Sequence, residues 1–126
     1  MSAAPNPLRE RGIAILADLV GFPSVSLRPN GDIVGHIEAY LAGHGIACRR
    51  DAHEDGDRFN LLACIGPQAE GGVLLSGHLD VVPADAAGWT QDPFRLRRAD
   101  GRLHGRGAVD MTVSYTHLRA HETQRN

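Results

Sequence analysis

Residues 72–80 read Gly-Val-Leu-Leu-Ser-Gly-His-Leu-Asp, an apolar run followed at once by polar and acidic side chains. The run Val73-Leu74-Leu75 shows no polar alternation, which is typical of a strand buried on both faces of a helix-covered sheet. Functional groups in open α/β folds tend to lie just beyond the carboxyl end of such a strand. The stretch therefore predicts a buried strand over 72–76 and the start of a functional site at 76–80.

Upstream of this strand, hydrophobic spacing predicts two helices. Asn6 can cap the first helix, Pro7 suits its first position, and residues 21–23 end it. Its buried stripe is expected at three- and four-residue steps, at Leu8, Gly12, Ile15, Leu16, Leu19 and Val20. The second helix is expected to begin near residues 30–32 and to end at Gly43 or Gly45, with a buried face formed by Ile33, Ile37, Tyr40 and Leu41.

Further strands are predicted on both sides of the central run. Residues 46–50 and 60–65 read as strands, and residues 94–98 and 102–104 flank the glycine-containing turn Ala99-Asp100-Gly101, which predicts a hairpin. Helices followed by strands with short connections indicate an α/β architecture.

The composition limits the classes of function. The 126 residues include 13 basic and 15 acidic side chains, a net charge of −2 without the basic surplus that nucleic-acid binding needs. No apolar run approaches about 18 residues, so no membrane span is predicted, and the N-terminus does not resemble a secretory signal. Two cysteines, Cys48 and Cys64, are too few for a disulfide scaffold, which favours a reducing, cytoplasmic setting.

His78 and Asp80 are the first candidates for chemistry. Two residues apart on an extended backbone, their side chains point to the same side. A neutral imidazole is a good zinc ligand, and a nearby carboxylate can fix its tautomer. Taken alone, a His-x-Asp pair is more often a surface pair or a loop cap, so this alternative stays open at this point.

The second candidate is Asp110, at the end of the glycine-rich stretch Gly105-Arg106-Gly107-Ala108-Val109. Glycines let the backbone adopt unusual dihedral angles or approach a ligand closely. A carboxylate has two oxygens and can bridge two metal ions about 3.5–4 Å apart. The alternative for Asp110 is a turn or capping aspartate.

Taken together, the motifs form an arrangement with a known counterpart. Residues 75–83 (LSGHLDVVP), 89–94 (WTQDPF) and 100–111 (DGRLHGRGAVDM) resemble, in order and spacing, the M20 family of di-zinc amidohydrolases. Within that family they are most similar to acetylornithine deacetylases. Asn60-Leu61-Leu62-Ala63 and the helix ending in Gly21-Phe22-Pro23-Ser24-Val25-Ser26 fit the same pattern, so that the resemblance extends over residues 7–111.

This resemblance implies a partial zinc-peptidase-like catalytic domain, with helices packed on a mixed, mainly parallel sheet. It implies that His78 is a ligand of one zinc, that Asp80 is the catalytic-site carboxylate orienting this histidine, and that Asp110 bridges two Zn2+ ions, for which Co2+ can substitute. The Asp110–Met111 peptide bond is expected to be cis. Arg106 and Trp89 match recurrent positions that we interpret as structural, whereas four histidines match no ligand position: His36, His44, His53 and His104.

The activity implied is hydrolysis of an N-acyl amino acid, foremost N-acetyl-L-ornithine to L-ornithine and acetate in arginine biosynthesis. The alternatives are succinyl-diaminopimelate desuccinylase, another M20 deacylase or peptidase and, from a different class, a non-catalytic metal-binding or interaction module. The expected partner is a small-molecule substrate, without nucleic acid or membrane, and the full-length protein is expected to be a homodimer.

The resemblance stops after Met111, where the family continues with Lys-Gly-Gly or a close variant. Residues 112–126 instead contain Ser-Tyr-Thr-His-Leu-Arg-Ala-His-Glu-Thr, which resembles translated sequencing adapter, and the composition changes at the same point. We therefore predict two segments: a catalytic-domain part, 1–111, and a non-family tail, 112–126, that is a sequencing artefact. His117 and His121 in the tail lack the glutamate of the zincin motif. Because the family's general base and remaining ligands lie downstream, the chain is expected to be an inactive N-terminal fragment.

Overall fold

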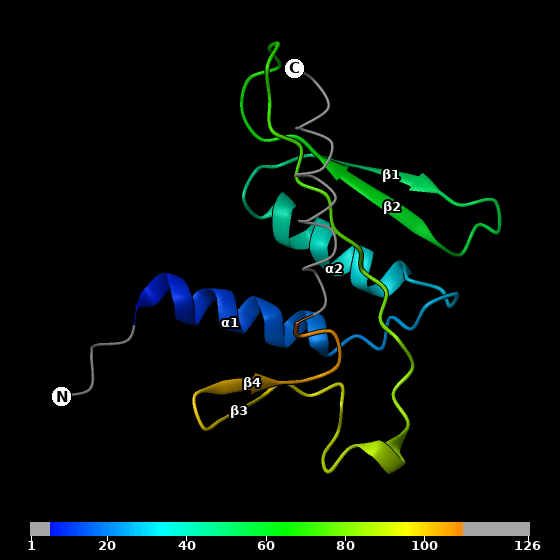
Figure 1. Cartoon of the computed structure of the whole chain (residues 1–126). Coiled ribbons are helices and arrows are strands. Elements are labelled where there is room, and N and C mark those ends of the chain that lie inside the picture. Colours follow the sequence, from blue (N-terminus) through cyan, green and yellow to red (C-terminus); the bar gives the residue numbers. More distant parts are fainter. Residues whose placement is uncertain (1–5, 110–126) are drawn as a thin grey trace, which may run out of the picture.

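A computed structural model describes residues 6–109 (Figure 1). At Ala86 it describes the backbone and not the side chain. The predictions for Asp110, the Asp110–Met111 bond, His117 and His121 lie outside the described residues.

Helix α1 spans Pro7–Val20, as predicted. The Asn6 side chain caps it by accepting hydrogen bonds from the backbone N–H groups of Leu8 (3.0 Å) and Arg9 (3.4 Å), and Gly21 is its C-cap.

The stripe predicted on α1 is confirmed only in its C-terminal half. Val20 is buried and Ile15, Leu16 and Leu19 are half-buried. Leu8, in contrast, is 80% exposed, and Gly12 is also exposed. The first turns make polar contacts instead: Glu10 pairs with Arg98, and Arg11 contacts His44.

Helix α2, Gly31–Ala42, supplies most of the core. Ile33 is 4% exposed and Val34, which the predicted face omitted, is fully buried. Asn30 does not cap the helix through its side chain. Its amide instead bonds both main-chain groups of Phe59, accepting from the N–H (2.8 Å) and donating to the C=O (3.0 Å). This side chain ties the start of α2 to the next strand pair.

Strands β1 (Cys48–Ala52) and β2 (Phe59–Ala63) pair antiparallel, from Cys48 opposite Ala63 to Ala52 opposite Phe59. Figure 1 shows α2 lying alongside this hairpin. An ion pair joins the two, with Arg50 Nη2 2.5 Å from Glu38 Oε2. The two strands predicted from sequence are confirmed, each with slightly shifted bounds.

The second sheet consists of β3 (Arg97–Ala99) and β4 (Arg102–His104), an antiparallel hairpin that follows the short 3-10 helix η1 (Ala86–Gly88). Its turn residues have positive φ, 51° at Asp100 and 72° at Gly101, as a tight two-residue hairpin turn of type I′ requires. The predicted hairpin is confirmed, except that its first strand spans 97–99 and not 94–98. Figure 1 shows the hairpin against α1 on the side away from α2.

The prediction of a buried strand over 72–76 is wrong. These residues are irregular, and Val73, Leu74 and Leu75 are 87%, 68% and 74% exposed. An apolar run becomes a strand only where neighbouring strands pair with it, and no strand within residues 6–109 pairs with this run. The α/β class is confirmed, but both sheets of the described chain are antiparallel pairs, and its parallel component is the single bridge between Val25 and Val81.

Among residues 6–109, no helix has the length and apolarity needed to cross a lipid bilayer. Cys48 and Cys64 are both free thiols.

Candidate active site

The backbone of the candidate site is held by two segments far apart in the sequence. Val25 and Val81 form the parallel bridge: Ser26 N–H donates to Val81 O (3.0 Å) and Val81 N–H donates to Ser24 O (2.9 Å). The Ser24 hydroxyl, on a residue only 6% exposed, donates to Leu79 O at 2.6 Å. The segment that follows α1 therefore fixes the main chain that carries His78 and Asp80.

His78 and Asp80 lie together at this position, with side chains that meet. Nδ1 of His78 is 2.9 Å from the main-chain oxygen of Asp80 and 3.1 Å from its Oδ1. Both neighbours are acceptors, so Nδ1 carries the proton, and the lone pair of the neutral ring is on Nε2. No residue within 6–109 hydrogen-bonds that Nε2.

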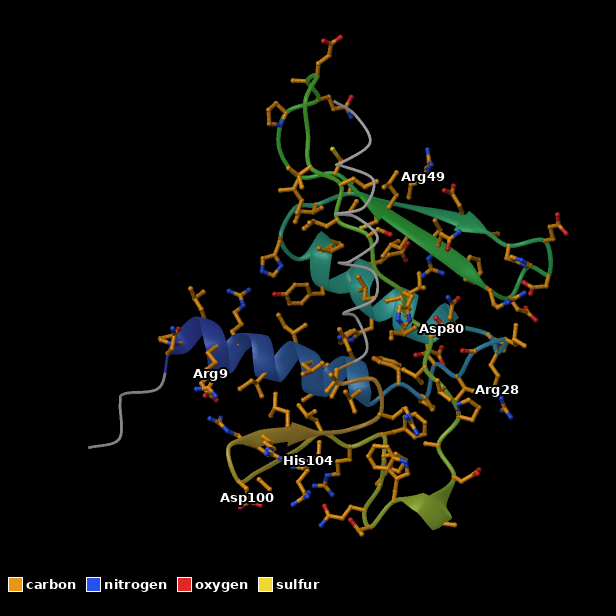
Figure 2. The ribbon with its side chains drawn as sticks, in the orientation of Figure 1. Arg9, Arg28, Arg49, Asp80, Asp100 and His104 are labelled. Carbon is orange, nitrogen blue, oxygen red and sulfur yellow. The ribbon has the colours of Figure 1, made fainter. Side chains whose placement is uncertain are left out.

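The Asp80 carboxylate is held at both oxygens. Oδ1 faces His78, and Oδ2 accepts a hydrogen bond of 2.5 Å from the Ser26 hydroxyl. The Ser26 hydrogen bond is the largest cause that lowers the pKa of Asp80; partial burial opposes it, and the charge of His78 adds to it. Asp80 is therefore a carboxylate at neutral pH. Figure 2 shows it beside the segment that joins α1 to α2.

Ser26 was not among the candidate residues predicted from sequence. The signal available was the Ser24-Val25-Ser26 stretch at the end of the first helix, which matches the family pattern. A serine has many partners open to it, and only the pairing of residues 24–26 with 79–81 shows which one this hydroxyl has.

The pair lines an open groove of about 680 Å³. One wall is formed by residues 76–80 and the second by residues 24–28. The third is formed by α2, by β2 and by the residue before β2, with a mixed surface that includes Ile37, Leu41, Arg58, Phe59 and Asn60. His78 is thus accessible from a concave surface, with its side chain 39% exposed.

The donor set fits part of a zinc site. A zinc-binding histidine typically donates its other ring N–H to a carboxylate or carbonyl, and His78 does so with both kinds of oxygen of Asp80. In the described part of the chain, no cluster of three or more His, Cys, Asp or Glu residues could hold a metal. The metal-ligand role of His78 therefore stays a prediction, and its predicted companion Asp110 lies outside the described residues.

Three further histidines have contacts of their own. His36 is 4.0 Å from Asp18, His44 contacts Arg11, and His53 is 3.2 Å from Asp55. His104 lies on β4 opposite Arg97.

Arg106 and Trp89 make contacts that fit their predicted structural role. The guanidinium carbon lies 5.1 Å from the centre of the indole ring, within the range of a cation–π contact. Arg106 N–H also donates to Pro93 O (2.7 Å), and its Nη2 to Pro83 O (3.4 Å). The loop between Asp80 and β3 is thereby tied to the glycine-rich stretch that leads to Asp110.

Known proteins share both the sequence and the geometry of this region. Residues 74–119 match Peptidase family M20/M25/M40. Acetylornithine deacetylase of Shigella sonnei is 54% identical over 106 residues, which make up 79% of this chain and 27% of that protein. Succinyl-diaminopimelate desuccinylase of Rhodospirillum centenum is 42% identical over 112 residues, 86% of this chain and 27% of that protein. The chain spans about a quarter of the length of these curated relatives.

A solved structure agrees with the sequence relatives. Human carnosine dipeptidase 1 superposes with a TM-score of 0.69 at 28% identity, covering 81% of this chain and 25% of that one. The family match runs to residue 119 and so crosses the predicted segment boundary at 111, which stays a prediction. The motif at 76–80, the sequence relatives and the superposition agree: this chain is similar, over about a quarter of their length, to proteins of Peptidase family M20.

Proposed function

We propose that this chain carries the N-terminal part of the active site of a zinc-dependent amidohydrolase acting on N-acyl amino acids, with N-acetyl-L-ornithine as its substrate. The observation that carries the proposal is the placement of His78, whose Nδ1 faces two oxygens of Asp80 and whose Nε2 is left available. The 54% identity to an acetylornithine deacetylase supports the choice of substrate.

Each residue has a distinct role in this proposal. His78, through Nε2, and Asp110 would hold the metal pair, and Asp80 would keep the imidazole of His78 in the tautomer that leaves Nε2 for a metal. When bound, a zinc pair supplies Lewis-acid polarisation of the amide carbonyl and lowers the pKa of a water. Asp80, ionised next to the ring, makes His78 a stronger ligand. A cytoplasmic location belongs to the proposal, because two free cysteines fit a reducing compartment.

Succinyl-diaminopimelate desuccinylase is the second candidate, and its 42% identity over 112 residues favours it specifically. Both candidate reactions cleave an amide of an amino acid, so the His78–Asp80 pair serves either one. The acyl group, acetyl or the longer and charged succinyl, distinguishes them.

The test uses the protein that the source gene encodes when the gene is read through position 112. This protein is purified and loaded with zinc. We expect hydrolysis of N-acetyl-L-ornithine with a higher kcat/KM than for N-succinyl-diaminopimelate. His78→Ala should abolish turnover, whereas His36→Ala, a change at a histidine that contacts Asp18 instead, should leave turnover intact.

Three outcomes would count against the proposal. A preference for the succinyl substrate would favour the second candidate, and an active His78→Ala variant would remove His78 from the metal site. A source gene that ends after codon 126, with no turnover of either substrate, would favour a non-catalytic module.

A further inference from the structure

We propose that Ser26 is a positioning residue for the candidate metal site: its hydroxyl fixes the Asp80 carboxylate so that His78 presents Nε2 to a metal. The inference rests on the proposed function in taking His78 as a metal ligand. It goes beyond that proposal in assigning the alignment of the ligand to a side chain 54 residues upstream of Asp80.

Packing cannot hold the Asp80 side chain, because it is 57% exposed. Its orientation within the described chain depends on two polar contacts, Oδ1 with His78 and Oδ2 with Ser26. Without the serine contact, rotation of the carboxylate away from His78 would be opposed by one hydrogen bond alone. Once the carboxylate has rotated away, the main-chain carbonyl of Asp80 would be the acceptor left for His78 Nδ1. A carbonyl lacks the negative charge that makes the histidine a stronger metal ligand.

The Ser26 hydroxyl has two acceptors in reach, Asp80 Oδ2 at 2.5 Å and Val81 O at 3.3 Å. It has a single proton, and a short hydrogen bond to a carboxylate is about twice as strong as one between neutral groups. The proton therefore goes to Asp80. Ser26 itself is anchored, because its main-chain N–H donates to Val81 O at 3.0 Å.

Ser24 provides a matched control two residues away on the same segment. Its hydroxyl donates to a main-chain oxygen, that of Leu79, and not to a carboxylate. Removing the Ser24 hydroxyl loosens the backbone of the site, whereas removing the Ser26 hydroxyl releases the carboxylate. The two substitutions separate a structural role from a positioning role.

The experiment uses the 126-residue chain and its Ser26→Ala, Ser26→Thr and Ser24→Ala variants, studied by NMR at neutral pH. The Hα–Hβ couplings of Asp80 report its rotamer, and ring shifts during addition of ZnCl₂ report zinc affinity at His78, with His36 as an internal reference ring. We expect one Asp80 rotamer in the wild type and averaged couplings in Ser26→Ala. Zinc affinity at His78 should fall about 10-fold in Ser26→Ala, with no change at His36.

Ser26→Thr retains the hydroxyl and should restore both the rotamer and the affinity. Ser24→Ala should speed amide exchange at Val81 while leaving the Asp80 couplings those of one rotamer. Unchanged couplings in Ser26→Ala, or equal loss of zinc affinity in Ser24→Ala and Ser26→Ala, would overturn the inference. If His78 of the 126-residue chain binds no zinc, the Asp80 couplings alone decide whether Ser26 positions Asp80, and the proposed function is decided separately by the turnover of the protein read through position 112.

Discussion

Strand β2 and the run 73–75 are both short and rich in apolar residues, and yet only one of them forms a strand. In β2 exposure alternates, with Leu61 half-buried and Leu62 46% exposed, and each residue pairs with β1. Val73, Leu74 and Leu75 are all more than 65% exposed and have no strand partner within residues 6–109. The difference lies in the partner, because β1 is next to β2 along the chain and is reached by a short turn.

The same contrast applies to anchoring. Asn30 holds Phe59, at the start of β2, through two hydrogen bonds. The main chain near His78 is held only after the apolar run, at residues 79–81, by Ser24 and Ser26. A run with high β-propensity thus stays irregular when its neighbours along the chain offer neither a strand nor an anchor.

The largest expected effect separates a packed valine from an exposed one. Val34→Asp places an unpaired carboxylate at a fully buried position and should cost more than about 4 kcal/mol, removing cooperative urea unfolding. Val73→Asp makes the same change at a position 87% exposed and should alter the free energy of unfolding by less than about 0.5 kcal/mol. Equal destabilisation by the two variants would mean that the run 73–75 is packed after all.

The next effect concerns the close contact between the backbone of Gly107 and the side chain of Val81, next to the candidate site. Gly107 has φ of 79°, and a Cβ there would lie 2.6 Å from Val81 Cγ1. Gly107→Ala combines backbone strain with a clash and should cost about 3 kcal/mol. Gly101→Ala, at φ of 72° with no atom within 4 Å of the added Cβ, has strain alone and should cost about 1 kcal/mol. Thermal unfolding of both variants measures the difference, and identical shifts would argue against the contact with Val81.

Asn30→Ala tests the anchor of β2. Loss of the two hydrogen bonds to the Phe59 main chain should cost about 2 kcal/mol in urea unfolding. It should also speed amide exchange in β2. Asn60→Ala, at the exposed residue that follows Phe59 on β2, serves as the control. If the two variants were equally stable, β2 would owe its order to pairing with β1 alone.

The smallest effect is the pH dependence of the link between α2 and β1. The hydrogen bond from Arg50 is the largest cause that holds the pKa of Glu38 below its ordinary value of about 4.3. A lowered pKa in the folded state stabilises the fold above the pKa of the unfolded chain, and this stabilisation is lost as pH falls through the folded pKa. The stability difference between wild type and Glu38→Gln should therefore be constant from pH 6 to 8 and shrink below about pH 4. A difference independent of pH would show that the ion pair contributes nothing.

Elements that depend on local chemistry could be predicted from the sequence. Asn6 and Gly21 bound α1, and Asp100-Gly101 makes the tight turn of the second hairpin. Features that depend on distant partners could not be predicted: the irregular conformation of residues 72–76, the exposure of Leu8 and the full burial of Val34. Periodicity identifies the side chains that can be buried, whereas neighbouring elements decide which of them are.

The candidate site divides in the same way. The two-residue spacing of His78 and Asp80 is local, and so is the contact between them. Ser26 acts across 54 residues, and no sequence spacing specifies such a pairing. Asp110 lies beyond the described residues, and its part in the site stays a prediction.

The most direct test of the account is the tautomer of His78, measured by long-range ¹H–¹⁵N NMR on the 126-residue chain at a pH where the ring is neutral. The account predicts a proton on Nδ1, facing Asp80, and a lone pair on Nε2. A proton on Nε2 would mean that Asp80 does not hold the ring and that His78 is not prepared to bind a metal.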